Sequence, residues 1–255
     1  MNIVQAIILG IVEGLTEFLP ISSTFHLIFV SKLLGIQQTN FAKLFEVFIQ
    51  SGAILSVLFL YFKTFTTDWE TMKKVLLSFL PTAIIGFILY KMIKEVFFES
   101  SLLMLTVFIA IGVFFIAYEW LIKKHKVQLI RSIANLTYAE AIIIGLIQAL
   151  AIVPGVSRAG AVIVAMMILR FKRDESAKYS FLLSVPTIFA ASAYDLFKMR
   201  QELVSSGNNI LLLLIGFVSA FISAYIVVKW FIKYLQTHSL KSFGIYRIIA
   251  GMFFS

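Results

Sequence analysis

Two glutamates, Glu13 and Glu17, lie four positions apart in an apolar stretch near the start of the sequence. Residues at this spacing share one face of a helix, one turn apart, so both carboxylates point the same way. The sequence places no basic residue beside them. Because ionisable side chains at membrane depth usually face a cavity and function there, we predict that the chemistry of this chain is centred on the pair.

The polar turn that follows the glutamates supplies hydroxyl groups and an imidazole. Ser22, Ser23 and Thr24 come directly after the apolar stretch, and His26 follows Ser23 by three residues. Pro20 interrupts the helix just before them, and a broken helix end exposes backbone N–H groups that favour an anion such as phosphate. The turn therefore offers candidate nucleophiles and an anion-binding backbone in one place.

A second polar turn holds Ser157 and Arg158 shortly after a Pro-Gly step. The charged, planar fork of arginine suits a bidentate contact with phosphate. Two carboxylates, hydroxyl groups, an imidazole and an arginine that converge on one cavity would be suited to phosphoryl chemistry, with or without a metal ion. The absence of cysteine excludes thiol catalysis, disulfides and cysteine–metal sites.

These residues also have purely structural interpretations. Glu13 and Glu17 could pair with Arg158 to neutralise the interior of a helix bundle. Serines in apolar helices often hydrogen-bond to their own backbone, and a single histidine can be a hydrogen-bonded residue at the membrane interface. We favour the functional interpretation because the polar residues cluster after Pro20.

The elements that must hold these residues are transmembrane helices. Of the 255 residues, 60% are hydrophobic and 14% are charged, and the mean hydropathy is +0.97. Soluble domains carry about 25% charged residues, and a helix that crosses a bilayer needs about 20 apolar residues. The composition predicts an all-α integral membrane protein, with one polytopic domain over residues 1–255 and no soluble module. We expect no cleaved signal peptide, because no charged region precedes the first apolar stretch.

The sequence matches itself at an offset of 135 residues. Under this shift Ser22 falls on Ser157, and Glu13 falls on Gln148. We therefore predict an internal duplication, a frequent plan for membrane folds with a central site. The repeats span about 1–125 and 136–255, with five helical segments each: 2–17, 23–35, 40–62, 74–96 and 102–124, then 138–152, 158–170, 174–197, 208–235 and 242–254.

The first two segments of each repeat are too short to cross a bilayer. Segments of 13 to 16 residues make helices of roughly 20–24 Å, against a hydrocarbon core of about 30 Å. Each short pair is joined by a polar, proline-containing turn, so we predict one re-entrant helical hairpin and three true spans per repeat. An odd number of spans requires an inverted repeat, which would bring the two turns together near the midplane.

The positive charges predict the orientation and the surroundings. The formal net charge is +9, and the bases fall in loops without interleaved aromatic residues, so we expect membrane lipid and not nucleic acid as the partner. One side carries fourteen of the 22 lysines and arginines and should be cytoplasmic, which leaves both termini and the mouth of the first hairpin facing outward. The fourteen are Lys63, Lys73, Lys74, Lys123, Lys124, Lys126, Arg131, Arg170, Lys172, Arg173, Lys178, Lys229, Lys233 and Lys241.

At these same residues the chain resembles the undecaprenyl-diphosphate phosphatases, the bacitracin-resistance family of bacterial membrane enzymes. The resemblance covers essentially the whole sequence, and its specific parts are EGLTEFLPISS followed by His26, and PGVSR. It implies removal of the terminal phosphate of undecaprenyl diphosphate, which regenerates the carrier lipid for peptidoglycan synthesis and confers bacitracin resistance. It also implies a divalent cation, Mg²⁺ or Ca²⁺, and a multi-pass protein of the bacterial cell membrane (the inner membrane in Gram-negative cells) whose active site opens to the outer face.

The resemblance assigns roles by motif position. Glu13 and Glu17 match the glutamate pair of the family, which binds the metal and activates the nucleophile, and Ser23 matches the serine nucleophile. His26 matches an essential histidine whose role as base, acid or nucleophile stays open. Four residues are expected to bind the substrate: Arg158, Ser157, Ser22 and Thr24.

Three residues depart from the family pattern. Phe25 stands where a glycine usually precedes the histidine and is expected to crowd the turn, while Ala159 and Val162 replace a serine and a threonine. Loss of the two hydroxyls would weaken phosphate binding by about 0.5–1.5 kcal/mol per hydrogen bond. A catalytically impaired relative is therefore one alternative to an active phosphatase.

A membrane transporter or lipid flippase is the alternative from another functional class, because inverted repeats with broken helices are usual in secondary transporters. Such a protein would move the diphosphate lipid intact, whereas a phosphatase releases phosphate in detergent. The prenyl chain length, the preferred metal and the oligomeric state, a homodimer included, stay open from the sequence. Arg247 lies within the last apolar segment, and its type and spacing assign it no role.

Overall fold

The computed structural model describes residues 1–92, 101–200 and 210–253, and these form α-helices and short 3-10 turns without a named strand. The prediction of an all-α protein is confirmed. The elements are α1 (Ile3–Thr16), α2 (Ser23–Leu33), α3 (Asn40–Leu60), α4 (Phe62–Thr67), α5 (Trp69–Met92), α6 (Ser101–Lys124), η2 (Ile133–Asn135), α7 (Tyr138–Ala149), η3 (Leu150–Ile152), α8 (Arg158–Ile168), α9 (Arg173–Lys198), α11 (Ile210–Thr237) and α12 (Lys241–Phe253).

Five helices of the described part are long and apolar enough to cross a membrane: α3, α5, α6, α9 and α11. The sequence predicted six such spans, and the segment 242–254 is not among the five. Its helix, α12, has 13 residues, which is roughly 20 Å and shorter than a hydrocarbon core of about 30 Å. The segment 74–96 also differs, since α5 begins at Trp69 and residues 93–96 lie outside the described part.

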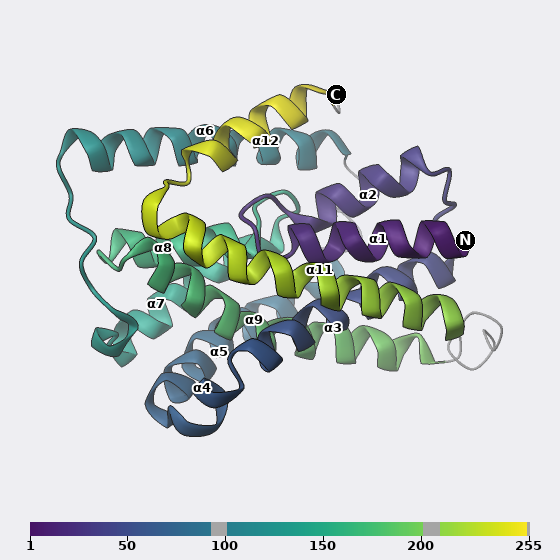
Figure 1. The fold of residues 1–255 in the computed structure, drawn as a ribbon, viewed down its shortest axis with the longest axis horizontal. Coiled ribbons are helices and arrows are strands. Elements are labelled where there is room, and N and C mark those ends of the chain that lie inside the picture. Colours follow the sequence, from purple (N-terminus) through teal and green to yellow (C-terminus); the bar gives the residue numbers. More distant parts are fainter. Residues whose placement is uncertain (93–100, 201–209, 254–255) are drawn as a thin grey trace.

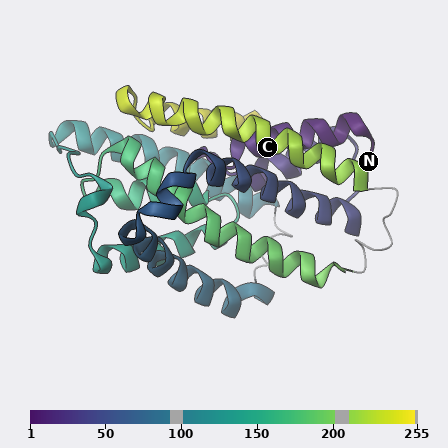
Figure 2. The ribbon, with the colours of Figure 1, turned by 60° about the horizontal axis from the view of Figure 1, so that its bottom comes forward.

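The predicted hairpins are present as pairs of short helices, α1 with α2 and α7 with α8. In Figure 1 both pairs lie among the long helices, with α1 beside α11 and α6 beside α12. Figure 2 shows α3 between α9 and α11, and these three helices contact one another. The hairpins are therefore held by the long helices of the bundle.

Two pairs of packed helices, α1 with α11 and α7 with α5, are related by the offset of 135 residues. Helix α1 packs on α11, and its counterpart α7 packs on α5, the counterpart of α11. A Cβ added to Gly10 of α1 would collide with the carbonyl oxygen of Gly216, and one added to Gly145 of α7 would collide with that of Ser78. Small residues let helix backbones approach closely in membranes, so these equivalent glycines bring each hairpin against a long helix. The duplication itself stays a prediction that these contacts favour.

The helix ends of the two hairpins also correspond. Ser22 and Ser157, which directly precede α2 and α8, have positive φ angles of 65° and 74°. Gly35 and Arg170, which follow the same two helices, have φ angles of 64° and 68°. Left-handed backbone is uncommon in residues other than glycine and carries strain. The two serines with positive φ are therefore the N-cap residues of α2 and α8.

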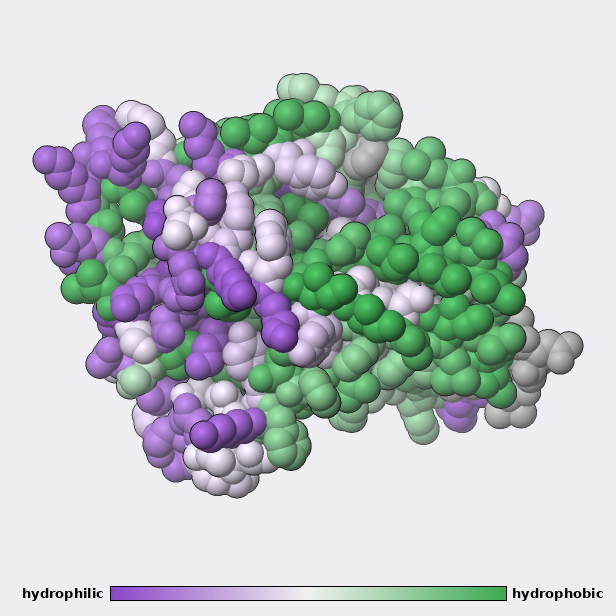
Figure 3. Space-filling model, in the orientation of Figure 1, coloured by the Kyte–Doolittle hydropathy of each residue, from purple (hydrophilic) through white to green (hydrophobic). Residues whose placement is uncertain are grey.

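The surface divides into an apolar belt and a polar end. Large apolar side chains such as Phe59, Phe87 and Trp120 are more than half exposed on the spanning helices, as expected for side chains that face lipid. Figure 3 shows hydrophilic residues gathered over the end where Figure 1 places α4 and the connection from α6 to α7, while hydrophobic residues cover much of the remaining face. The molecule therefore has the surface of a multi-pass membrane protein.

Candidate active site

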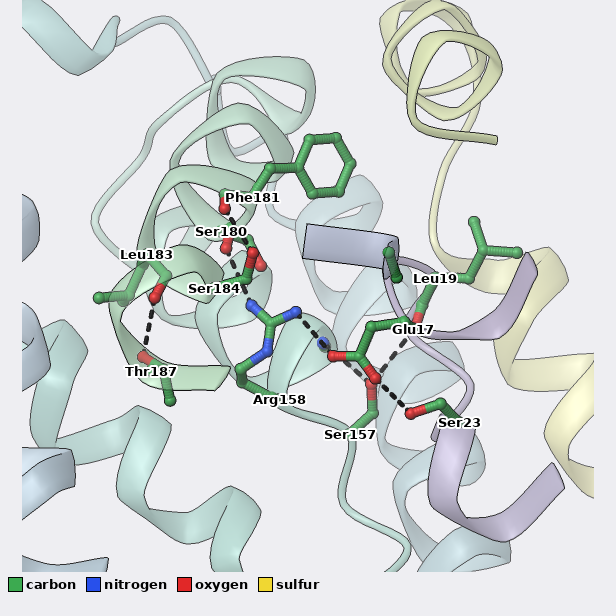
Figure 4. Close-up of polar contacts among 12 residues, drawn as sticks. Glu17, Leu19, Ser23, Ser157, Arg158, Ser180, Phe181, Leu183, Ser184 and Thr187 are labelled. Carbon is green, nitrogen blue, oxygen red and sulfur yellow. Dashed lines mark hydrogen bonds and ion pairs between the residues drawn. The ribbon is translucent and has the colours of Figure 1, made fainter. Parts of the chain in front are cut away.

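The centre of the site is the carboxylate of Glu17, the residue that ends α1. One of its oxygens accepts a hydrogen bond from the Ser23 hydroxyl at the start of α2, and the other accepts one from Arg158 Nη2 at 3.2 Å. Figure 4 shows the three side chains converging from both hairpins. The structure thus joins residues 141 positions apart in the sequence around a single carboxylate.

Arg158 is fixed on its other side by α9. Its Nη1 donates to the carbonyl oxygen of Ser180 at 2.9 Å, and its side chain is only 12% exposed. Its Nε–H has no hydrogen-bond partner among the described residues. A buried cation with a spare donor is well suited to binding an anion, since the cost of its burial has already been met by Glu17 and by the backbone.

Aromatic packing sets the spacing between these groups. Phe18, the residue after Glu17, packs edge-on against Phe181, the residue after Ser180, with ring centroids 5.4 Å apart. Both rings are fully buried, and Phe181 also contacts Phe231 of α11 at 6.1 Å. This apolar contact holds the end of α1 at a fixed place beside α9, and so positions the carboxylate against the guanidinium.

A cavity of about 160 Å³ opens beside the three side chains. Liquid water occupies about 30 Å³ per molecule, so this volume holds several waters or a phosphate group. Gln50 of α3 is part of the wall. Six of the eight predicted site residues also line it: Glu17, Ser22, Ser23, Thr24, Ser157 and Arg158.

The hydroxyl of Ser157 caps a helix as well as facing the cavity. It accepts a hydrogen bond from the backbone N–H of Gly160 at 3.3 Å and donates to the carbonyl of Leu19 at 3.4 Å. The first contact caps the N-terminus of α8, and the second ties the second hairpin to the turn of the first.

Glu13, the other predicted glutamate, is completely buried one turn before Glu17. Neither of its carboxylate oxygens has a hydrogen-bond partner in the described part of the chain, and it is not part of the cavity wall. A buried carboxylate without a partner is costly, and a cation is one group that would satisfy it.

The carboxylate oxygens near the cavity are too few to bind a divalent cation alone, and would bind one together with the phosphates of a substrate. No group of three or more acidic, histidine or cysteine side chains suited to a metal occurs among the described residues. Mg²⁺ is commonly bound by one or two carboxylates, with substrate phosphates and water completing its shell. The orphaned oxygens of Glu13 and the neighbouring Glu17 fit that pattern.

His26 lies apart from the cavity. Its Nδ1 is 2.8 Å from the carbonyl oxygen of Ser22, and its Nε2 is 2.6 Å from the hydroxyl of Tyr246 on α12. The imidazole also stacks on the Tyr246 ring, with centroids 5.7 Å apart. With a carbonyl at Nδ1, that nitrogen carries the proton and Nε2 accepts from the tyrosine. Both ring nitrogens are therefore engaged, and Glu17, not His26, contacts the Ser23 hydroxyl.

The three residues that depart from the family pattern are accommodated by packing. Phe25 is buried and stacks on Phe108 of α6, with ring centroids 3.9 Å apart. Ala159 and Val162 are fully buried and do not line the cavity, and Val162 belongs to an apolar cluster with Leu182. The larger ring in the turn is thus matched by an aromatic partner.

Sequence reasoning missed Arg247 and Tyr246, neighbours on α12. The buried guanidinium of Arg247 donates to the carbonyl oxygens of Phe108 at 2.9 Å and Pro20 at 3.1 Å, and also to that of Gly155. Pro20 and Gly155 belong to the turns of the two hairpins, so one side chain ties both turns together. The available signal was an arginine within an apolar segment, which is rare at membrane depth unless it is satisfied by protein.

Comparisons with known proteins agree with one another. The family model described as "Bacitracin resistance protein BacA" matches residues 6–253. A protein named undecaprenyl-diphosphatase from Sulfurihydrogenibium sp. (strain YO3AOP1) is 51% identical over 255 residues, which are 100% of this chain and 98% of that protein. Proteins of the same name from Persephonella marina and Aquifex aeolicus are 48% and 44% identical, over 100% and 98% of this chain and 98% and 96% of their own lengths.

Proposed function

The chain belongs to the bacitracin resistance protein BacA family, and on that premise we propose that it hydrolyses undecaprenyl diphosphate and releases the terminal phosphate. The relatives named undecaprenyl-diphosphatase support this activity, and their names do not favour the transporter alternative. The product, undecaprenyl phosphate, is the carrier lipid for peptidoglycan synthesis, and its regeneration underlies bacitracin resistance. The observation that carries the proposal is the serine hydroxyl and the buried arginine meeting on one carboxylate beside a phosphate-sized cavity.

The reaction begins at Ser23. Its hydroxyl donates to Glu17, so the carboxylate is placed to take the proton as Oγ attacks the terminal phosphorus. The anhydride P–O bond breaks, undecaprenyl phosphate leaves with the bridging oxygen, and the phosphoryl group stays on Ser23. Water then attacks the phosphoserine, and inorganic phosphate is released with the serine regenerated.

Arg158 neutralises the diphosphate. Its Nε–H is a spare donor, and a phosphate that enters the cavity also competes with Glu17 for Nη2. When the phosphate takes over the guanidinium, the Glu17 carboxylate is freed to accept the Ser23 proton. Arginine is well matched to this exchange because its fork binds phosphate and carboxylate with the same geometry.

A divalent cation, Mg²⁺ or Ca²⁺, is part of the proposal. Glu13 and Glu17 would hold it, which the unsatisfied oxygens of Glu13 support. When bound, the cation supplies positive charge that offsets the diphosphate.

We further propose that the two halves are inverted repeats and that the site opens to the outer face of the bacterial cell membrane. Three features support the repeat: glycines at equivalent positions, serines with positive φ at equivalent positions, and the packing of the first helix of each half on a long helix of the other half. Hydrophilic residues gather at one end of the molecule (Figure 3), and this gathering, together with the fourteen lysines and arginines assigned to one side, supports a cytoplasmic assignment of that end.

Phosphate release in detergent tests the function directly. We expect the purified protein to release phosphate from undecaprenyl or farnesyl diphosphate, and a chelator to suppress the release. Glu17→Ala and Arg158→Ala should each lower the rate by about 100-fold or more, whereas Lys63→Ala, an exposed change, should leave it unchanged. A wild-type rate for either site variant would contradict the mechanism. Absence of phosphate release from folded wild-type protein would contradict the function, because transport alone produces no phosphate.

A further inference from the structure

A second hollow lies away from the catalytic cavity, between α6 and α12. It has a volume of about 880 Å³ and shares no lining residue with the cavity around Arg158. Its walls combine apolar side chains of the bundle with basic side chains from the polar end of the molecule. The hollow, called here the α6–α12 groove, is therefore amphipathic.

The apolar wall of the groove is continuous with the lipid-facing surface. Val113 and Trp120 of α6 line it and are 52% and 57% exposed, and Ile248 of α12 faces them. Helix α6 is one of the five apolar helices long enough to cross the membrane. A hydrocarbon chain could therefore enter the groove sideways from the bilayer without crossing a polar barrier.

The basic wall carries three lysines without ionic partners. Lys123, Lys126 and Lys241 line the groove, and none forms an ion pair within the described part of the chain. The carboxylate of Glu119, also in the wall, is already occupied by Arg173, with hydrogen bonds of 3.0 and 2.5 Å. Three uncompensated ammonium groups in one concave site attract an anion.

We propose that the α6–α12 groove binds an anionic phospholipid, with an acyl chain along Val113 and Trp120 and the headgroup phosphate among the three lysines. An apolar wall with a cluster of bases at one end matches an amphipathic anion in both of its parts. Clusters of lysine and arginine at the membrane surface attract anionic lipid headgroups in this way. The proposal is independent of the phosphatase reaction, because none of these residues lies in the catalytic cavity.

Tryptophan quenching tests the proposal, because Trp120 is in the groove wall. The other two tryptophans, Trp69 and Trp230, are replaced by phenylalanine, which leaves Trp120 as the sole reporter. The full-length protein is placed in phosphatidylcholine nanodiscs that contain a small fraction of brominated phosphatidylglycerol, or the same fraction of brominated phosphatidylcholine. We expect the anionic lipid to quench Trp120 more strongly than the neutral lipid. The neutral lipid should need to be present at about five times the amount, or more, to give the same quenching.

Two matched triple variants identify the site. Replacing all three groove lysines, Lys123, Lys126 and Lys241, by glutamine should reduce quenching by the anionic lipid to the level of the neutral lipid. The control removes the same charge from three exposed lysines outside the groove and should keep the preference: Lys63→Gln, Lys229→Gln and Lys233→Gln. Phosphate release by both triples verifies that they are folded.

Three outcomes overturn the proposal. Equal quenching by the two lipids shows that the groove does not select an anion. An equal loss in both triple variants shows a general effect of surface charge. Relief of the quenching by millimolar inorganic phosphate shows that the site takes free phosphate and not a lipid headgroup.

Discussion

Glu17 serves two partners at once, because each of its oxygens faces a different hairpin. Ser23 donates to one oxygen and Arg158 to the other, so the proposed nucleophile and the guanidinium are aligned through a single carboxylate. A single change at this position therefore disturbs both groups. Around this core, two residues of α12 act on the site without lining it, Tyr246 through His26 and Arg247 through the turns.

Tyr246→Phe tests the positioning of the histidine. The change keeps the stacked ring but removes the hydroxyl that lies 2.6 Å from His26 Nε2. Loss of one buried hydrogen bond corresponds to about 0.5–1.5 kcal/mol, so we expect kcat to fall by roughly 2–10-fold with little change in KM. Tyr225→Phe is the control, since its hydroxyl accepts a hydrogen bond from the exposed Lys229 of α11 and has no other polar partner among the described residues. Equal kcat values for the two variants would argue against a positioning role.

Arg247→Met tests the tie between the two turns. Methionine fills a similar volume but leaves the carbonyls of Pro20 and Gly155 without this donor, and each unsatisfied buried group costs about 1–3 kcal/mol. We expect a loss of roughly 2–6 kcal/mol, measured as a lower thermal midpoint in detergent. Arg200→Met is a matched control, because this exposed arginine also contacts one carbonyl and one phenyl ring. An unchanged midpoint for the Arg247 variant would refute the tie.

The meeting of Glu17, Ser23 and Arg158 could be predicted from the sequence, because the motifs and the repeat offset place two polar turns at equivalent positions. The α12 residues could not. Arg247 binds backbone carbonyls, which leave no signature in residue type, and Tyr246 lies 220 positions from its partner. The orientation of His26 away from the cavity was equally hidden, since spacing on a helix does not reveal which neighbour holds a side chain.

At the scale of elements, the short helices place polar residues inside the bundle, which a helix that spans the membrane without a break does not do. Helix α1 ends just before Glu17, α2 begins at Ser23 and α8 begins at Arg158, and these three polar residues line the cavity and do not face lipid. Segment length predicted these hairpins, while the helix in the segment expected as a span at 242–254 has only 13 residues in the described part of the chain. Apolar composition does not distinguish a span from a short helix such as α12, which packs along α6.

Gly10→Ala tests the close packing of α1 against α11. A Cβ at this position meets the carbonyl oxygen of Gly216 on α11, and backbone cannot move aside cheaply. We expect a lower thermal midpoint and reduced activity, although alanine favours a helix by about 1 kcal/mol over glycine. Gly86→Ala is the control, because a Cβ there would meet none of the described residues within 4 Å and the change should be neutral or stabilising. A gain in stability at position 10 would contradict the close packing.

At the scale of the whole molecule, the ion pair between Arg131 and Glu140 stabilises the polar end outside the membrane-spanning helices. Arg131 joins the connection between the two halves to α7 through two hydrogen bonds to Glu140, at 2.6 and 3.0 Å. Hydrogen bonds from Arg131, with support from Thr137, lower the pKa of Glu140 to about 2. The ionised carboxylate thus stabilises the fold at neutral pH.

This pair predicts a pH dependence of stability. Because the folded pKa of Glu140 lies below its usual value of 4.5, its contribution is fully present above about pH 4.5 and is lost as the pH falls toward 2. We expect Glu140→Gln to lower the thermal midpoint at pH 7, by the equivalent of about 1 kcal/mol after allowance for solvent screening. The gap between variant and wild type should narrow below pH 4.5 and close as the pH approaches 2. A gap that is constant with pH would contradict the assignment.

The tie made by Arg247 also has a consequence for biosynthesis. A ribosome completes both hairpins before it reaches α12, and 90 residues separate Ser157 from Arg247. At roughly 5–20 residues per second, the nascent chain therefore carries both polar turns for about 5–18 s before the arginine is made. The two turns are therefore joined by a helix that is synthesised last, and a prematurely released chain would hold the proposed catalytic residues without the arginine that links their turns.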